Sequence, residues 1–474
     1  MSTKRLKSTL DHLDTLLTNL NQEFSSKRGQ IAYPTIKSNL ETAAQNYRIA
    51  LSTLKTILSV YILDTARLVA DASKKRTKTQ TVDDVLDRLW GDELNNSYGM
   101  GETILSDFTR ELDPNIPLEL YYLVLELFED FGFAENFVLR QGGQFVSETF
   151  EETVFSKLRP LLESAKPPVV PGTLETVPTV PDFMELWAST AKNVGETVPN
   201  LVNTIVYIEG EAHNPLLWPI LIHEGFHLMD RRLHFFEEVE EIMFGRTLTL
   251  DKSEPKEVNR KWAREIFQDI CAVHYFGPLY AYSLLTYFEK LPYIQTIGYP
   301  EMSSRLYAVK LYVERGLSNI TYTNFLAEGA KFCSPTLAKE IQKYEENNQL
   351  DGSVEKELER FYDVVASWLD ARGVRLFTKR LRQYVTESSE AVRAPVEGDL
   401  DLMPYVDSIF TLDDVVKLLF KDEVALAIDP MILLNIGLMN SAPYTPEGWY
   451  KMYVNCIRKY RIKKAWKDVL LKRA

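Results

Sequence analysis

Cysteine is scarce in this sequence, and the few cysteines are far apart. Only Cys271, Cys333 and Cys456 occur among 474 residues. An odd number of widely spaced thiols makes a disulfide framework improbable and favours a reducing compartment. The N-terminus also lacks a continuous apolar run with a small-residue cleavage site, which argues against a secretory signal. We therefore expect an intracellular, cytoplasmic protein whose thiols are buried.

Basic residues are outnumbered by acidic ones. The chain has 54 Lys and Arg against 67 Asp and Glu, a formal net charge of −13. Because such a surface repels phosphate backbones, we expect no nucleic acid as the main partner. The exception is the basic stretch at 456–474, which we interpret as a solvated final helix. Contact with an acidic partner or a membrane surface is the alternative for this stretch.

Uncharged runs of membrane-spanning length are rare as well. Residues 270–288 carry no Asp, Glu, Lys or Arg and just reach the length of a bilayer span. The stretch contains Gly277-Pro278, His274 and several aromatic residues with polar neighbours, so its hydrophobicity is moderate. A buried core helix is the better interpretation, and we expect no membrane span.

Helical patterns account for most of the chain. The leucines from Leu6 to Leu20 alternate spacings of four and three, and a second helical pattern covers residues 36–72. Together they predict a helical hairpin, which is a core element in the simplest interpretation and a surface for a protein partner in the other. Thr81 and Asp84 have the spacing of an N-cap and a third helical position. The glycines of 97–102 predict the end of that helix.

Residues 115–165 are predicted to be mostly helical, with a glycine turn near 140–145. Six prolines then follow within a short segment, and each fixes φ and removes a backbone donor. Residues 159–182 are therefore predicted to form an extended crossing segment.

Five of the six histidines lie between residues 213 and 274. In "LIHEGFHLMD", residues 221–230, His223 and His227 are four residues apart. This spacing puts both imidazoles on one helical face, about 6 Å apart along the axis, where they can bind one zinc ion. Glu224 is turned by roughly 100° from His223, which places it to touch a metal-bound water. The alternative is a helix whose histidines are satisfied by core hydrogen bonds.

The third ligand does not follow from the same motif. The HExxHxxGxxH pattern needs Gly at position 230 and His at position 233, but the chain has Asp230 and Leu233, and His234 falls one residue late. Asp230 shares the helix with His227, so it cannot easily complete a tetrahedron from another direction.

A downstream helix offers a better carboxylate. Glu265 and Asp269 are four residues apart, so both face the same way from a largely apolar helix. We hypothesise that Glu265 is the third metal ligand. We further hypothesise that Asp269 accepts a hydrogen bond from the N–H of a ligating histidine on the side of the ring that faces away from the metal. Other acids between the two motifs remain alternatives to Glu265, although clustered acids more often form a solvated face. They are Glu237, Glu238, Glu240 and Glu241.

Through "HEGFH" and "EIFQD", in this order, the sequence resembles the gluzincin metallopeptidases, the thermolysin-like group of the zincins. The resemblance covers only a minority of the chain. It implies one zinc ion bound by His223, His227 and Glu265. It further implies that Glu224 is the general base and that Asp269 orients His223.

Upstream of the motif, residues 203–208 alternate as a strand that leads through a loop to the metal helix. The edge of such a strand can pair with an extended peptide, which makes a peptide or protein the expected substrate. We expect a zinc peptidase. The alternative is a non-catalytic interaction or regulatory protein that retains a zincin-like scaffold.

The expected fold is mainly α, with helical N-terminal and C-terminal regions around a small zincin-like α+β core. The expected regions are 1–158 for the N-terminal helices, 159–182 for the crossing segment, 183–300 for the metal-binding core and 301–474 for the C-terminal helices.

Overall fold

The chain divides into two compact units. The computed structural model describes residues 2–28, 34–75, 80–112, 118–165, 180–196, 200–208, 211–277, 279–290, 299–316 and 350–380, together with Asp429, Met431 and Asn435. Unit 1 consists of Met1–Ile116, Glu135–Gly142 and Val146–Val206, and unit 2 of Pro117–Ala134, Gly143–Phe145 and Tyr207–Ala474.

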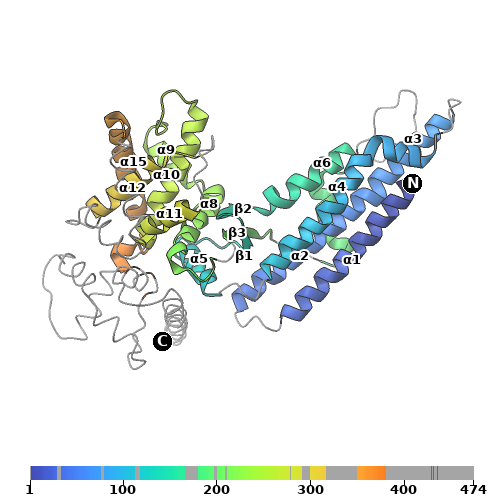
Figure 1. Ribbon diagram of the computed structural model, residues 1–474, viewed down its shortest axis with the longest axis horizontal. Helices are drawn as coiled ribbons and strands as arrows, with labels where there is room; N and C mark the ends of the chain where they lie inside the picture. Colours follow the sequence, from blue (N-terminus) through green and yellow to red (C-terminus); the bar gives the residue numbers. More distant parts are fainter. Residues whose placement is uncertain are drawn as a thin grey trace. The chain divides into compact units, whose positions relative to one another are not determined.

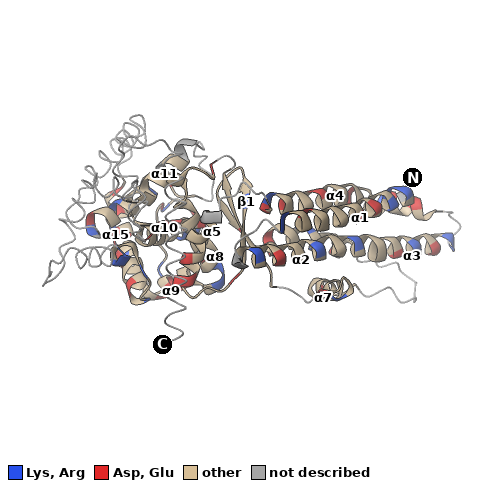
Figure 2. Cartoon of the chain, turned by 90° about the horizontal axis from the view of Figure 1, so that it is seen from below, with Lys and Arg blue, Asp and Glu red and all other residues tan. Residues whose placement is uncertain are grey.

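Unit 1 is mainly helical, and its long helices run side by side (Figure 1). Its helices are α1 (Ser2–Arg28), α2 (Pro34–Thr56), η1 (Ile57–Ile62), α3 (Leu63–Lys74), α4 (Val82–Glu111), η2 (Glu151–Phe155), α6 (Ser156–Ser164) and α7 (Phe183–Asn193). α1 packs against α2 and α4, and Leu6, Leu13 and Leu20 are buried there. The apolar patterns near the N-terminus therefore predicted both helices and their contact. Charged residues of both signs lie along these helices (Figure 2).

The start of α4 confirms the predicted N-cap, but α4 does not end where the sequence predicts. The Thr81 hydroxyl accepts a hydrogen bond from the Asp84 N–H at 3.2 Å, and the Asp84 carboxylate accepts one from the Thr81 N–H at 2.9 Å. This reciprocal pair is a capping box. The predicted end at 97–102 is wrong, because α4 continues to Glu111. Gly101 instead lets α4 approach α1, since a Cβ there would lie 2.7 Å from Leu13 Cδ2.

A three-stranded sheet has the order β1-β3-β2. Its strands are β1 (Phe137–Gly142), β2 (Val146–Glu148) and β3 (Asn203–Ile208). β2 pairs antiparallel with β3, with Val146 opposite Val206. The predicted strand at 203–208 is confirmed, whereas the prediction of mostly helix over 115–165 missed β1 and β2. The first four residues of β1 are all buried, and the short apolar run 137–139 within them lacks the alternation that distinguishes a strand from a helix.

The position of β3 corrects a second expectation. β3 is the middle strand, and β2 pairs with Thr204–Val206 on one side of it, so the paired part of β3 offers no free edge to an extended peptide. The route from a strand edge to a peptide substrate is therefore not supported.

Unit 2 is built around a long buried helix, α10. Its helices are α5 (Leu118–Asp130), η3 (Pro215–Leu217), α8 (Ile220–Leu233), α9 (Phe235–Ile242), α10 (Lys256–Phe276), α11 (Leu279–Lys290), α12 (Met302–Leu311), η4 (Tyr312–Gly316) and α15 (Gly352–Ala371). α10 packs against α8, α11, α12 and α15. The uncharged stretch 270–288 is divided between α10 and α11 at Gly277, whose φ of +105° ends the first helix.

One continuous helical stretch in the described part of the chain, Ile36–Lys74, is long and apolar enough to cross a membrane. Length and composition alone support this, and buried core helices have the same properties. The stretch is weak evidence for a membrane span.

The mainly α fold is confirmed, and the two units follow other boundaries than the expected regions. α7 and most of β3 belong to unit 1 rather than to a core at 183–300, and α5 belongs to unit 2. Cys271 is buried, as expected for a structural thiol. Cys333, Cys456, most of the proline-rich segment and the basic stretch at 456–474 lie outside the described residues.

Candidate metal centre

α8 carries both histidines of the HExxH motif, and local sequence defines where it begins and ends. Pro219 precedes its first residue, and the helix stops at His234, which adopts a left-handed conformation with φ 56°. Gly225, between the two histidines, lets α5 pack closely, since a Cβ there would lie 2.7 Å from Leu127 Cδ2. The motif is therefore held in the core of unit 2, with His223 only 4% exposed.

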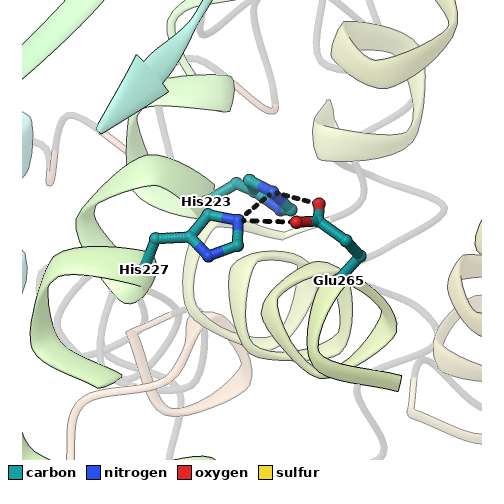
Figure 3. Close-up of side chains that lie close together, drawn as sticks. All are labelled: His223, His227 and Glu265. Atoms are coloured by element: carbon teal, nitrogen blue, oxygen red, sulfur yellow. Dashed lines mark hydrogen bonds and ion pairs between the residues drawn. The ribbon is translucent and has the colours of Figure 1, made fainter. Parts of the chain in front are cut away.

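Glu265 on α10 completes a cluster with the two histidines (Figure 3). The Nε2 atoms of His223 and His227 lie 3.0 Å apart. The Glu265 carboxylate oxygens lie 3.5 Å from His223 Nε2 and 3.4 Å from His227 Nε2. Three ligand atoms of the predicted set thus converge on one point from two helices.

The separation of the two imidazole nitrogens fits a tetrahedral zinc ion. Ligand atoms bound at about 2.0 Å in a tetrahedron stand roughly 3.3 Å from one another, which is close to the 3.0 Å between His223 Nε2 and His227 Nε2. The two Glu265 distances belong to different carboxylate oxygens, so the carboxylate faces both nitrogens at once. The donor set of two imidazoles and a carboxylate is one that zinc prefers. Two imidazole nitrogens that face each other beside a carboxylate also call for a cation or a proton between them. The residues present therefore fit zinc.

The electrostatics of the cluster favour positive charge at its centre. Burial opposes the charged form of His223, but hydrogen bonds to Asp269 and Glu265 outweigh it and raise the pKa of His223 to about 9. Burial likewise opposes the carboxylate of Glu265, yet the neighbouring histidines hold its pKa well below its usual range. Within this cluster, a proton and a metal ion compete for the same place.

Asp269 lies beside the Nδ1 atom of His223, on the side of the ring where the sequence led us to expect it. His223 Nδ1 is 3.0 Å from Asp269 Oδ1. Asp269 is fully buried and also accepts hydrogen bonds from the Tyr280 hydroxyl at 2.5 Å and from Arg305 Nε at 2.6 Å. Burial opposes the carboxylate form of Asp269, but the charge and hydrogen bonds of Arg305, together with His223, outweigh it and lower the pKa of Asp269.

Sequence reasoning missed both of these partners. The sequence singled out neither Tyr280 nor Arg305 as a partner of Asp269. No spacing in the sequence connects Arg305 with Asp269, which lies 36 residues earlier.

Glu224 has no partner among the described residues. It is 7% exposed, and its carboxylate forms no hydrogen bond or ion pair with them. Burial, and then the charges of Glu265 and Glu224, raise the pKa of the Tyr299 phenol. Both carboxylates therefore act on the same partly exposed tyrosine.

Three of the four alternative carboxylates are engaged elsewhere, and the fourth, Glu241, is exposed on α9. Acidic residues gather on α9 (Figure 2), where Glu237 and Glu240 pair with Arg260, and Glu238 pairs with Arg372. Among the described residues, only His223, His227 and Glu265 form a group with the spacing of a metal site.

The remaining nearby acid and histidines have structural partners. Asp230 accepts a hydrogen bond from the Phe236 N–H at 2.7 Å and pairs with Arg264 at 3.1 Å, so it joins α8 to α9. His274 Nε2 lies 3.0 Å from the Tyr362 hydroxyl, and burial lowers the pKa of His274 to about 3. His234 is exposed at the turn between α8 and α9.

The sequence matches no protein-family model and no curated protein, and the fold matches no solved structure.

Proposed function

We propose that the chain is a zinc-dependent peptidase. The observation that carries the proposal is the grouping of His223, His227 and Glu265, whose ligand atoms all lie within 4.8 Å of one another, with Glu224 next to His223 in the sequence. In this proposal the site belongs to a gluzincin-like centre, with the zincin-like core and the cytoplasmic location expected from the sequence.

Each residue of the site has a separate task. His223, His227 and Glu265 hold the ion, and Asp269 fixes the ring of His223. When bound, zinc supplies Lewis acidity, which lowers the pKa of a coordinated water and polarises a carbonyl group. The Glu224 carboxylate accepts the proton of the attacking water and returns it to the leaving amine. A carboxylate without a hydrogen-bond partner among the described residues is suited to this transfer.

Metal analysis combined with Glu224→Gln tests the proposal. We expect the wild-type protein and Glu224→Gln to bind about one zinc ion each. Hydrolysis of a mixed library of internally quenched peptides should fall by about 10²- to 10⁴-fold in the variant, as expected for loss of a general base. The matched control is Glu241→Gln on α9, which should retain full activity.

Three results would contradict the proposal. They are a wild-type protein that binds no zinc, hydrolysis that is unchanged in Glu224→Gln, and zinc binding without hydrolysis of any peptide. The last result would favour the non-catalytic interaction protein instead.

A further inference from the structure

Two residues outside the predicted ligand set close a buried cluster around Asp269. Asp269 Oδ1 accepts hydrogen bonds from the Tyr280 hydroxyl at 2.5 Å and from Arg305 Nη2 at 2.6 Å, and it lies 3.0 Å from His223 Nδ1. Asp269 Oδ2 accepts a hydrogen bond from Arg305 Nε at 2.6 Å. None of these side chains is more than 5% exposed.

Resting on the proposed zinc site, we propose that Arg305 and Tyr280 are positioning residues of the metal centre. They hold the Asp269 carboxylate in the one orientation that makes His223 present Nε2 to the ion. Tyr280 contacts His223 at Nδ1, and the hydrogen bonds of Arg305 to Asp269 reach the same side of the ring, opposite the proposed ligand atom Nε2.

Donor and acceptor roles support this assignment. Tyr280 donates its only hydroxyl proton to Asp269, so its oxygen can accept a hydrogen bond but has no second proton to give. His223 Nδ1 therefore meets two acceptors, Asp269 at 3.0 Å and the Tyr280 oxygen at 3.1 Å. Both require a proton on Nδ1. The lone pair of the neutral ring is then on Nε2, the atom that faces His227 and Glu265.

The geometry of Arg305 explains why an arginine occupies this position. Its planar guanidinium uses Nε and Nη2 to contact both oxygens of the carboxylate, which fixes the carboxylate plane as well as its position. A lysine would supply the charge from a single nitrogen and leave the carboxylate free to turn.

Four helices meet at this cluster. α8 supplies His223, α10 supplies Asp269, α11 supplies Tyr280 and α12 supplies Arg305. α12 also packs against α10 and α15, so its position is defined by the core of unit 2. α12 supplies no metal ligand itself. Through Arg305 and Asp269, however, the position of α12 determines the orientation of the ligand His223.

A second Tyr–Asp–Arg cluster in unit 2 provides matched controls. The Tyr275 hydroxyl donates to Asp130 at 2.8 Å, and Arg380 donates to the Tyr275 oxygen at 2.9 Å and pairs with Asp130. Tyr275 and Arg380 are as buried as Tyr280 and Arg305. No member of this second cluster belongs to the metal-binding group.

The experiment measures zinc affinity at one fixed pH, by competition with a chromophoric chelator. Tyr280→Phe and Arg305→Lys should each weaken zinc binding by about 10- to 100-fold, as expected when a histidine ligand loses its support. Arg305→Met should weaken it further than Arg305→Lys. Tyr275→Phe and Arg380→Lys should bind zinc within about 3-fold of the wild type, since their effects are confined to stability.

Cobalt(II) supplies a spectroscopic readout that loss of stability alone does not alter. The visible absorption of the cobalt-loaded protein reports the ligand geometry, and we expect it to change in Tyr280→Phe but not in Tyr275→Phe. Tyr280→Phe removes only a hydroxyl, so it decides the question if Arg305→Met does not fold.

The outcomes separate the two proposals. Wild-type zinc affinity and an unchanged cobalt spectrum in Tyr280→Phe and Arg305→Lys would overturn the positioning role and leave the zinc site intact. Equal losses in the control variants would also overturn it. A wild-type protein that binds neither zinc nor cobalt would overturn the proposed function and the positioning role together.

Discussion

Glu111, the last residue of α4, has a carboxylate buried inside unit 1. The Tyr47 hydroxyl donates to its Oε1 at 2.8 Å and the Thr204 hydroxyl at 3.2 Å, while Oε2 has no hydrogen-bond partner in the described structure. Burial raises the pKa of Glu111 to about 8, against the opposing charge of Arg140 and the hydrogen bond from Tyr47. The folded protein therefore keeps this acid protonated near neutral pH.

The raised pKa predicts that unit 1 loses stability as the pH rises. Between the ordinary pKa of 4.5 and the folded value of about 8, the folded state binds a proton that the unfolded state releases. Over this range the residue lowers the free energy of unfolding by about 1.4 kcal/mol per pH unit. Glu111→Gln removes the titration, so its unfolding free energy relative to the wild type should increase steadily from pH 5 to pH 8. Urea unfolding of both proteins across this range measures the difference.

Asp87→Asn is the control for the Glu111 prediction. Asp87 is exposed on the same helix, so its replacement should shift the unfolding curves equally at each pH. If Glu111→Gln and the wild type also keep a constant difference from pH 5 to pH 8, Glu111 is not protonated in the folded protein.

Single residues could be predicted from the sequence where their roles depend on local spacing. His223, Glu224 and His227 follow from the HExxH pattern, and the cap formed by Thr81 and Asp84 follows from their separation. Burial of Glu111 could not be predicted, because it depends on Tyr47 and Thr204, whose backbones belong to α2 and β3.

The end of α4 was predicted incorrectly because glycine occurs in helices for two different reasons. Glycine ends helices, but it also permits two helices to approach closely. Gly101 serves the second purpose, since a Cβ there would lie 2.7 Å from Leu13 Cδ2 and 3.0 Å from Leu16 Cδ1. Gly99, two residues earlier, has nothing within 4 Å of such a Cβ.

Substitutions of these two glycines should have opposite effects. Gly101→Val overpacks the contact between α1 and α4 and should lower the free energy of unfolding by about 1 to 3 kcal/mol. Gly99→Ala meets no obstacle and should raise it by about 0.5 to 1 kcal/mol, because alanine favours the helix. Urea unfolding of the two variants makes the comparison. Equal destabilisation by both would show that the packing of α4 against α1 does not explain Gly101.

The proposed metal ligands and their supporting side chains all belong to unit 2. His223, Asp269, Tyr280 and Arg305 connect four helices of this unit, α8, α10, α11 and α12. Binding of an ion to the folded state alone stabilises that state by an amount set by the ion concentration relative to its Kd. The stabilisation should be greatest in the helices that carry the proposed ligands, α8 and α10.

Hydrogen exchange with and without zinc tests this distribution in the whole chain. At a free zinc concentration of about 100 Kd, the expected stabilisation is about 2.7 kcal/mol. Exchange should slow in peptides from α8, α10 and α12 and remain unchanged in peptides from α1 and α2. The variant His227→Ala should lose the protection. Equal slowing throughout both units would contradict a site confined to unit 2.

The sequence by itself determined the helical character of the chain and the pairing of His223 with His227, because helical periodicity and a four-residue spacing act within a single turn. Only the tertiary structure decided which acid joins them, since Glu265 alone among the described acids forms a group with both histidines, whereas Glu237 and Glu238 of α9 pair with arginines. The same holds for the contacts of Tyr280 and Arg305 with Asp269 and for the central place of β3. The physical reason is that these contacts join separate helices and strands, and only the burial of several elements against one another brings them together.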